Sequence, residues 1–178
     1  YAAGDVVETV HRVTGKKVWV PLAGPANKQG RVAGANAAGG NLKFKGILGS
    51  TIVRVGKLVA ARTGLSEKEA RKEGISYFVS YTHSPDHAGY YPGSELMAVK
   101  IIGEQPTGRL LGAQIVGPKG VDKRIDVLAT AIMAGMSVYD LEDLDLAYSP
   151  PFSSAKDPVN IAGFTAANII RGEVAVMT

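Results

Sequence analysis

A polar loop between two expected helical segments carries groups that can perform acid–base or binding chemistry. Residues 148–158 contain the phenol of Tyr148, three serine hydroxyls and the ammonium of Lys156. A phenol can donate a proton or stabilise a neighbouring anion, and the loop's prolines restrict its backbone. Rigid polar loops often serve as sites. The same hydroxyls could instead cap helices in a simple connector, so the loop alone leaves both interpretations open.

A second polar loop, residues 83–93, holds two of the three histidines and a pair of tyrosines. His83, Asp86 and His87 include residue types that bind metal ions. However, Pro85 makes a helical spacing of these side chains doubtful, and no fourth ligand is evident. We therefore expect a solvated loop and no metal site, with the tyrosines as its more interesting groups.

Gly4 and Asp5 follow a short apolar segment, residues 1–3, which we expect to be the end of a strand. Open α/β sheets bind ligands at the carboxyl ends of their strands, so the Asp5 carboxylate could contact a ligand. A Gly-Asp pair at such a place more often forms a turn with an Asx hydrogen bond. The local sequence favours the turn.

A helix is predicted from Gly24-Pro25 to about Ala38, because proline suits the beginning of a helix. Ala26, Gly30 and Gly34 recur along it at four-residue spacing and leave one face with almost no side chains. Tight packing on a neighbouring sheet is the commoner reason for such a face. The alternative is a ligand near the helix start, where free N–H groups and the helix dipole favour negative charge.

The elements that must position these residues follow from the apolar periodicity. Strands are predicted over residues 51–55, 58–63, 76–82, 95–102 and 109–116. The clearest hairpin pairs alternate apolar residues of the last two runs, namely Met97, Val99 and Ile101 with Leu111, Ala113 and Ile115. The pattern predicts an α+β fold, a mostly antiparallel sheet with helices packed on it, preceded by a strand and a helix.

Three helices are predicted around this sheet. Ser66 opens a short one with a capping box, and Gly74 ends it. A longer helix over residues 121–135 carries an apolar stripe, which must pack on the sheet or on a partner. The last helix begins with Asp157 as N-cap, followed by Pro158.

Composition excludes several classes of protein. With 178 residues, 46% of them apolar, the chain can build a hydrophobic core and is not intrinsically disordered. Its longest uncharged apolar run, residues 127–139, is shorter than the roughly 18 to 20 residues of a membrane span. Without cysteine it has no disulfide and no thiol nucleophile. A scattered net charge of +4 gives no reason to expect nucleic acid, so we expect a soluble, cytoplasmic protein.

Residues 1–5, 21–31 and 148–160 together resemble the coenzyme A-disulfide reductase and NADH oxidase branch of the flavin disulfide reductases. The resemblance covers nearly the whole chain and implies the C-terminal half of such an enzyme. Residues 1–46 would then be the end of an FAD-binding domain and residues 47–172 the dimerisation domain. Residues 173–178 would form a tail or linker, and both ends of the chain look cut.

The resemblance assigns flavin contacts to particular residues. Gly4 and Asp5 match the segment whose carboxylate binds the ribityl chain of FAD. Leu22 and Ala23 match the helix start under the flavin pyrimidine edge, where a positive dipole stabilises negative charge on the reduced ring. Tyr148 matches a tyrosine placed near the flavin and the redox cysteine from the partner subunit.

The resemblance also assigns substrate contacts and a catalytic role. Asn27 and Lys156 match positions that contact coenzyme A, although Asn27 stands where a histidine can occur. Tyr148, with Tyr90 as its companion, would supply a proton to the leaving thiolate.

The implied enzyme is a homodimer that uses FAD and NAD(P)H to reduce coenzyme A-type disulfides, persulfides or polysulfides. Its one redox cysteine and its nicotinamide site would lie outside this chain, so the chain alone is not expected to be active. An NADH oxidase of the same family is the alternative, and a rhodanese-like domain could follow the tail. The rival from another class is a non-catalytic dimerisation module whose apolar stripe, on residues 121–135, forms a symmetric interface.

Overall fold

The computed structural model describes residues 1–174, so the expected tail, residues 173–178, lies mostly outside the described residues. The chain divides into two compact units, one ending at Gly49 and the other beginning at Ser50. The expected assignment of residues 1–46 and 47–172 to two domains stays a prediction.

The first unit contains a short antiparallel strand pair and one helix, β1 (Thr9–Val10), β2 (Lys17–Val18) and α1 (Ala23–Ala37). The helix is confirmed to within one residue at each end. It begins before Pro25, which occupies the third helical position. The N–H groups of the first turn have no partner within a helix, so proline costs no hydrogen bond there.

The expected strand end at residues 1–3 is wrong for this chain. A strand exists only where a neighbour completes its ladder of hydrogen bonds, and residues 1–3 pair with no strand among the described residues. Gly4 instead has a φ of +85°, and its carbonyl accepts a hydrogen bond from the N–H of Val7 at 3.2 Å. Asp5 therefore lies in a turn.

The small-residue face of α1 is open in this unit. A Cβ atom added at Gly30 or at Gly34 would meet no atom within 4 Å. The expected tight packing against a neighbouring sheet is thus not found among the described residues of the chain.

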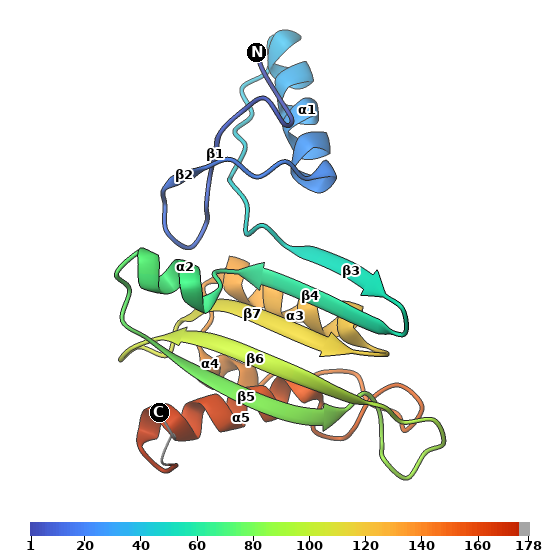
Figure 1. The fold of residues 1–178 in the computed structure, drawn as a ribbon. Helices are drawn as coiled ribbons and strands as arrows, with labels where there is room; N and C mark the ends of the chain where they lie inside the picture. The colour runs from blue at the N-terminus through green and yellow to red at the C-terminus, as the bar shows by residue number, and fades with distance from the viewer. Residues whose placement is uncertain (175–178) are drawn as a thin grey trace. The chain divides into compact units, whose positions relative to one another are not determined.

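The second unit is built on a five-stranded antiparallel sheet in the order β3-β4-β7-β6-β5 (Figure 1). Its strands are β3 (Thr51–Val55), β4 (Leu58–Gly64), β5 (Tyr77–Pro85), β6 (Leu96–Glu104) and β7 (Leu110–Gly117). The predicted hairpin is confirmed in its register, since Val99 pairs with Ile115 and Ile101 pairs with Ala113. These alternate residues are buried and form the centre of the core. The α+β fold expected from the sequence is confirmed.

Helices α3 (Val121–Ala134) and α5 (Pro158–Arg171) pack on the sheet (Figure 1). The apolar stripe of α3 is buried at Val121, Ile125 and Leu128, where the helix contacts β7 and β4. The stripe therefore packs on the chain's own sheet. The interpretation of this stripe as a symmetric dimer interface is wrong, because the stripe is already covered.

Capping explains the shorter helices. Ser66 and Glu69 form the predicted capping box at the start of α2 (Glu67–Lys72). A helix that was not predicted, α4 (Val138–Glu142), begins with a second capping box, between Ser137 and Asp140. Within the described part of the chain, no helix has the length and apolar character needed to span a membrane.

Candidate functional site

Two loops of the second unit bring a pair of tyrosines together at the surface. The hydroxyls of Tyr90 and Tyr148 are 2.9 Å apart and hydrogen-bonded, although the residues are 58 positions apart in sequence. Both side chains are exposed, Tyr90 by 76% and Tyr148 by 47%. The hydrogen bond with Tyr90 raises the pKa of the Tyr148 phenol above its ordinary value. The raised pKa keeps the Tyr148 phenol protonated at neutral pH, and the pair faces solvent.

Main-chain contacts join the loops that carry these phenols. The N–H of Ala88 lies 3.3 Å from the carbonyl oxygen of Pro150 and 3.0 Å from that of Ser153, and donates to both. Ala88 is buried and precedes Tyr90 by two residues. Pro150 follows Tyr148 by two residues, so these hydrogen bonds join the two loops within two residues of each tyrosine.

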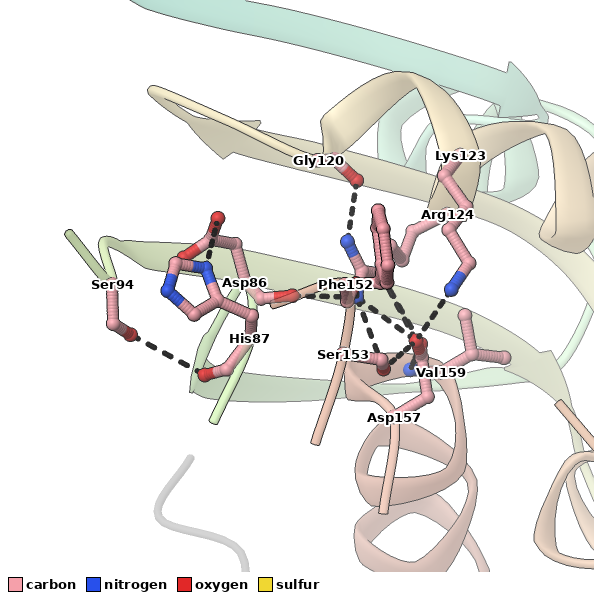
Figure 2. A network of polar contacts seen from close by, with 10 residues as sticks. All are labelled: Asp86, His87, Ser94, Gly120, Lys123, Arg124, Phe152, Ser153, Asp157 and Val159. Atoms are coloured by element: carbon pink, nitrogen blue, oxygen red, sulfur yellow. Dashed lines mark hydrogen bonds and ion pairs between the residues drawn. The ribbon is translucent and has the colours of Figure 1, made fainter. Parts of the chain in front are cut away.

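Arg124, on α3, is only 2% exposed, and its guanidinium lies among Asp86, Ser153 and Asp157 (Figure 2). Its guanidinium donates to the carbonyl oxygen of Asp86 at 2.7 Å and to a carboxylate oxygen of Asp157 at 2.9 Å. It also donates to the Ser153 hydroxyl at 3.3 Å and to the carbonyl oxygen of Gly120 at 3.2 Å. One cation thus contacts both loops and the start of α5.

Asp157 completes this buried network. Its carboxylate caps α5 by accepting from the N–H of Val159 at 3.0 Å, and it accepts from the Ser153 hydroxyl at 2.6 Å. Burial alone would raise the pKa of Asp157, but the hydrogen bonds from Arg124, Ser153 and Val159 outweigh burial and hold the pKa below its usual range. The predicted N-cap is confirmed, and the carboxylate is also the counter-ion of Arg124.

The histidine loop differs from the expected solvated loop in its first half. Asp86 and His87 are both buried, and the His87 Nδ1 lies 2.9 Å from a carboxylate oxygen of Asp86. Burial would raise the pKa of Asp86, but hydrogen bonds from Glu95 and His87 lower it. His83 is exposed on β5. Among the described residues, no group of three or more His, Cys, Asp or Glu side chains could hold a metal ion.

The residues expected to contact coenzyme A are both exposed, one in each unit. Lys156 directly precedes the capping Asp157. The buried network therefore fixes the backbone beside Lys156, while the side chain of Lys156 is exposed. Asn27 lies on the first turns of α1, where its side chain donates to the carbonyl oxygen of Ala23 at 2.9 Å.

Four of the residues expected to contact the flavin, Gly4, Asp5, Leu22 and Ala23, lie in the first unit, and Tyr148 lies in the second. The N–H of Gly4 donates to the side chain of the buried Gln29 at 2.8 Å, which ties the turn to α1. The indole of Trp19 donates to the backbone carbonyl of Asp5 at 2.7 Å. The Asp5 side chain is exposed, and neither of these bonds involves its carboxylate.

The start of α1 has the chemistry that a negatively charged flavin edge requires. Leu22 is the N-cap and Ala23 the first helical residue, and no side chain caps the N–H groups that follow. The first turn contains no acidic residue. Free N–H groups and an uncompensated positive dipole end favour an anionic or polar ligand, so these residues fit the expected group.

Sequence reasoning missed the residues that support the site, chiefly Arg124, Ser153 and Gln29. Arg124 had a detectable signal, since it follows Val121 by three residues and precedes Leu128 by four. It therefore lies on the apolar stripe of α3, where a buried cation needs partners. Ser153 and Gln29 had no comparable signal, because their burial depends on segments distant in sequence.

Known proteins resemble the chain over nearly its whole length. The NAD(P)H sulfur oxidoreductase (CoA-dependent) of Pyrococcus abyssi is 44% identical over 89% of this chain and 35% of its own. The NADH oxidase of Methanocaldococcus jannaschii is 35% identical over 91% of this chain and 36% of its own. The solved NAD-dependent persulfide reductase of A. fulgidus is 46% identical, with a TM-score of 0.97, over 99% of this chain and 33% of that one.

The chain thus spans about a third of the length of these relatives. The model of one protein family, described as pyridine nucleotide-disulphide oxidoreductase, dimerisation domain, matches residues 51–158. This match covers the sheet, α3 and the loops that hold both tyrosines, so the chain belongs to the family of pyridine nucleotide-disulphide oxidoreductase dimerisation domains.

Proposed function

We propose that this chain is part of a homodimeric FAD- and NAD(P)H-dependent enzyme that reduces coenzyme A-type disulfides, persulfides or polysulfides. The hydrogen-bonded, exposed phenols of Tyr90 and Tyr148 are the observation that carries the proposal. They offer a proton at the surface of a dimerisation domain, where a residue of one subunit can contribute to the active site of its partner. The chain itself supplies no thiol.

The proposed reaction balances with one proton from the phenol pair. Reductive cleavage breaks the S–S bond, adds two electrons from NAD(P)H and releases a thiolate. The Tyr148 hydroxyl forms the new S–H bond of the leaving thiol, and Tyr90 or solvent returns the proton. FAD, when bound, would carry the two electrons between the nicotinamide and the redox cysteine. For a disulfide the overall products are NAD(P)⁺ and two thiols, and for a persulfide they are NAD(P)⁺, a thiol and hydrogen sulfide; one further proton is consumed in each case.

The remaining site residues have roles in binding. Gly4, Asp5, Leu22 and Ala23 would hold FAD, supported by the exposed carboxylate and the uncapped start of α1. Asn27 and Lys156 would contact coenzyme A, supported by their exposure; an ammonium suits the phosphates of that molecule.

A sulfur acceptor is favoured over oxygen by the degree of similarity. The two relatives named for sulfur chemistry are 44% and 46% identical to the chain, and the NADH oxidase is 35% identical. Reduction of a disulfide also gives the phenol pair a defined task, because a leaving thiolate needs a proton.

A homodimer formed through the second unit is part of the same proposal. Its support is the family of dimerisation domains and an apolar hollow of about 370 Å³ on the exposed side of α3. Val127, Met136 and Leu144 are among the residues that line this hollow, whereas Val121, Ile125 and Leu128 of the buried stripe do not line it. The expected cytoplasmic location stays a prediction.

Tyr148→Phe in the full-length enzyme tests the proposed role. Loss of a positioned proton donor lowers rates by about 10²- to 10⁴-fold, and Tyr90 can substitute in part, so we expect kcat for coenzyme A disulfide to fall about 10- to 100-fold. The FAD content per protomer should not change, because the proposal assigns the binding of FAD chiefly to Gly4, Asp5, Leu22 and Ala23. Anaerobic oxidation of NAD(P)H measures the rate, and flavin absorbance measures the content.

Tyr81→Phe is the matched control, since Tyr81 is also an exposed tyrosine of the second unit but lies on β5. It should leave kcat within about twofold. Unchanged turnover in the Tyr148→Phe enzyme would remove the proton-donating role.

A further inference from the structure

The guanidinium of Arg124 connects three segments that carry the proposed chemistry. It donates to the carbonyl oxygen of Asp86 at 2.7 Å, in the loop that leads to Tyr90. In the loop that follows Tyr148 it donates to the carbonyl oxygen of Phe152 at 3.5 Å and to the Ser153 hydroxyl at 3.3 Å. Figure 2 shows these groups converging on the one side chain from different directions.

The third segment is the start of α5. The two donors Nε and Nη2 of Arg124 reach the same carboxylate, that of Asp157, at 3.2 Å and 2.9 Å. The Ser153 hydroxyl donates to this carboxylate and accepts from Arg124, so the three side chains form a closed triangle. Lys156 is the residue immediately before the carboxylate.

Stability alone is a poor explanation for this arrangement. Desolvating a cation and a carboxylate costs several kcal/mol each, and apolar replacement of a whole buried pair is often neutral or stabilising. Here Arg124 donates not only to the Asp157 carboxylate but also to backbone carbonyl oxygens in two loops. Such a cation fixes the position of the two loops relative to each other, while the phenols of Tyr90 and Tyr148 that they carry stay exposed.

We propose that Arg124 is a positioning residue, which acts through Ser153 and Asp157 to hold the Tyr90–Tyr148 pair and the Lys156 backbone in one reactive arrangement. This inference rests on the proposed function. A short series of contacts connects the Arg124 guanidinium with the backbone near both phenols. Asp86 is two residues from Ala88, whose N–H bonds the carbonyls of Pro150 and Ser153 on the other loop.

A double-mutant cycle in the full-length holoenzyme tests the inference, with NADH and coenzyme A disulfide under anaerobic conditions. Ser153→Ala removes two of the three contacts of the triangle but leaves Arg124 paired with Asp157. Arg124→Lys keeps the charge but cannot reach all the acceptors. A misplaced catalytic group can cost up to about 10²-fold in rate. We expect each variant to lower kcat about 5-fold or more, and to raise KM because Lys156 shares the anchor.

The same substitutions should lower kcat by less than about twofold when made in the Tyr148→Phe enzyme, since residues that act through one group are not additive. Loss of stability alone would not produce this dependence on Tyr148. Arg109→Lys is the control, because Arg109 makes two hydrogen bonds to Glu104 away from both loops. It should leave kcat and KM unchanged in both backgrounds.

Two results separate the inference from the function on which it rests. If Ser153→Ala and Arg124→Lys slow the enzyme equally with and without the Tyr148 hydroxyl, the positioning role is overturned while the proposed function stands. If the unsubstituted enzyme does not reduce coenzyme A disulfide, persulfide or polysulfide, the proposed function itself fails. Because Ser153→Ala leaves both charges of the triangle in place, it keeps the test valid even if Arg124→Lys does not fold.

Discussion

The phenol pair is the smallest unit that explains the proposed chemistry. Each phenol can donate one hydrogen bond and accept others. With 2.9 Å between the two oxygens, one hydroxyl donates to the other and keeps its own acceptor sites free. The second hydroxyl can then direct its proton toward a ligand. A single exposed tyrosine would have no such orientation, because its hydroxyl rotates freely in water.

The hydrogen bond predicts a measurable pKa difference. Because the bond with Tyr90 raises the pKa of Tyr148, Tyr90→Phe should return that pKa to about the ordinary tyrosine value near 10. Carbon-13 NMR of ring-labelled tyrosine, titrated from pH 8 to about 12, follows each phenol separately. The chemical shift of Tyr81 at pH 8 should be the same in both proteins, as Tyr81 lies on β5 and outside the pair. A Tyr148 pKa that does not move would show that the two hydroxyls do not interact in solution.

At the scale of elements, the sheet could be predicted from the sequence, because the pattern that forms it lies within short segments of the chain. Met97, Val99 and Ile101 on β6 recur with the two-residue period of a strand, and Leu111, Ala113 and Ile115 on β7 do the same. Pairing the two runs in any register shifted by one residue would expose Ile101 and Ala113, so the pattern determined the register. The capping box at Ser66 was equally local.

The elements that were missed depend on distant partners or on weaker signals. Helix α4 has only five residues, and its capping box uses Asp140 where glutamate is usual. Residues 1–3 read as a strand end, but a strand needs a neighbour and none is present among the described residues. The role of Arg124 as a link between loops could not be derived, because Asp86 and Ser153 reach it only through tertiary folding.

The N-cap of α5 predicts a pH dependence of stability. The folded pKa of Asp157 lies below its unfolded value of about 3.9. The unfolded chain therefore binds this proton first, and the stabilisation is complete above about pH 4 and is lost as the pH falls through the folded pKa. Asp157→Asn should remove that part of the acid sensitivity. At neutral pH it should lower the free energy of unfolding by about 3 to 5 kcal/mol, because Arg124 keeps its buried charge without a counter-ion.

Urea unfolding of the chain between pH 3 and 7 measures this effect. Asp122→Asn is the control, since Asp122 is also near a helix start but exposed, and it should change stability little. Equal acid sensitivity in the Asp157→Asn protein and the unsubstituted chain would contradict a role for this carboxylate in the low-pH transition.

At the scale of the whole molecule, the first unit presents surfaces that its own residues do not use. The start of α1 has no side-chain cap, and a Cβ added at Gly30 or Gly34 would meet no atom of the described residues within 4 Å. The Asp5 carboxylate points to no partner that the structure describes. The chain spans only about a third of its relatives, and the proposed FAD site needs these same surfaces to be covered by the rest of the enzyme.

Gly30→Ala distinguishes a covered face from an open one. In this chain the new methyl group meets no atom within 4 Å, and alanine in a helix is more stable than glycine by about 0.5 to 1 kcal/mol. Thermal unfolding of the isolated chain, followed by circular dichroism, should therefore show a stabilised first unit. In the full-length enzyme the same methyl group should collide with a closely packed neighbour.

That collision should show as a loss of bound flavin or of thermal stability in the full-length Gly30→Ala enzyme, measured by flavin absorbance per protomer and by the unfolding temperature. Opposite signs in the chain and in the enzyme follow only if another part of the enzyme approaches the α1 backbone, because the residue and its own unit are the same in both. Stabilisation in both proteins, with full flavin content, would mean that this face stays open, and the small residues of α1 would then need a different explanation.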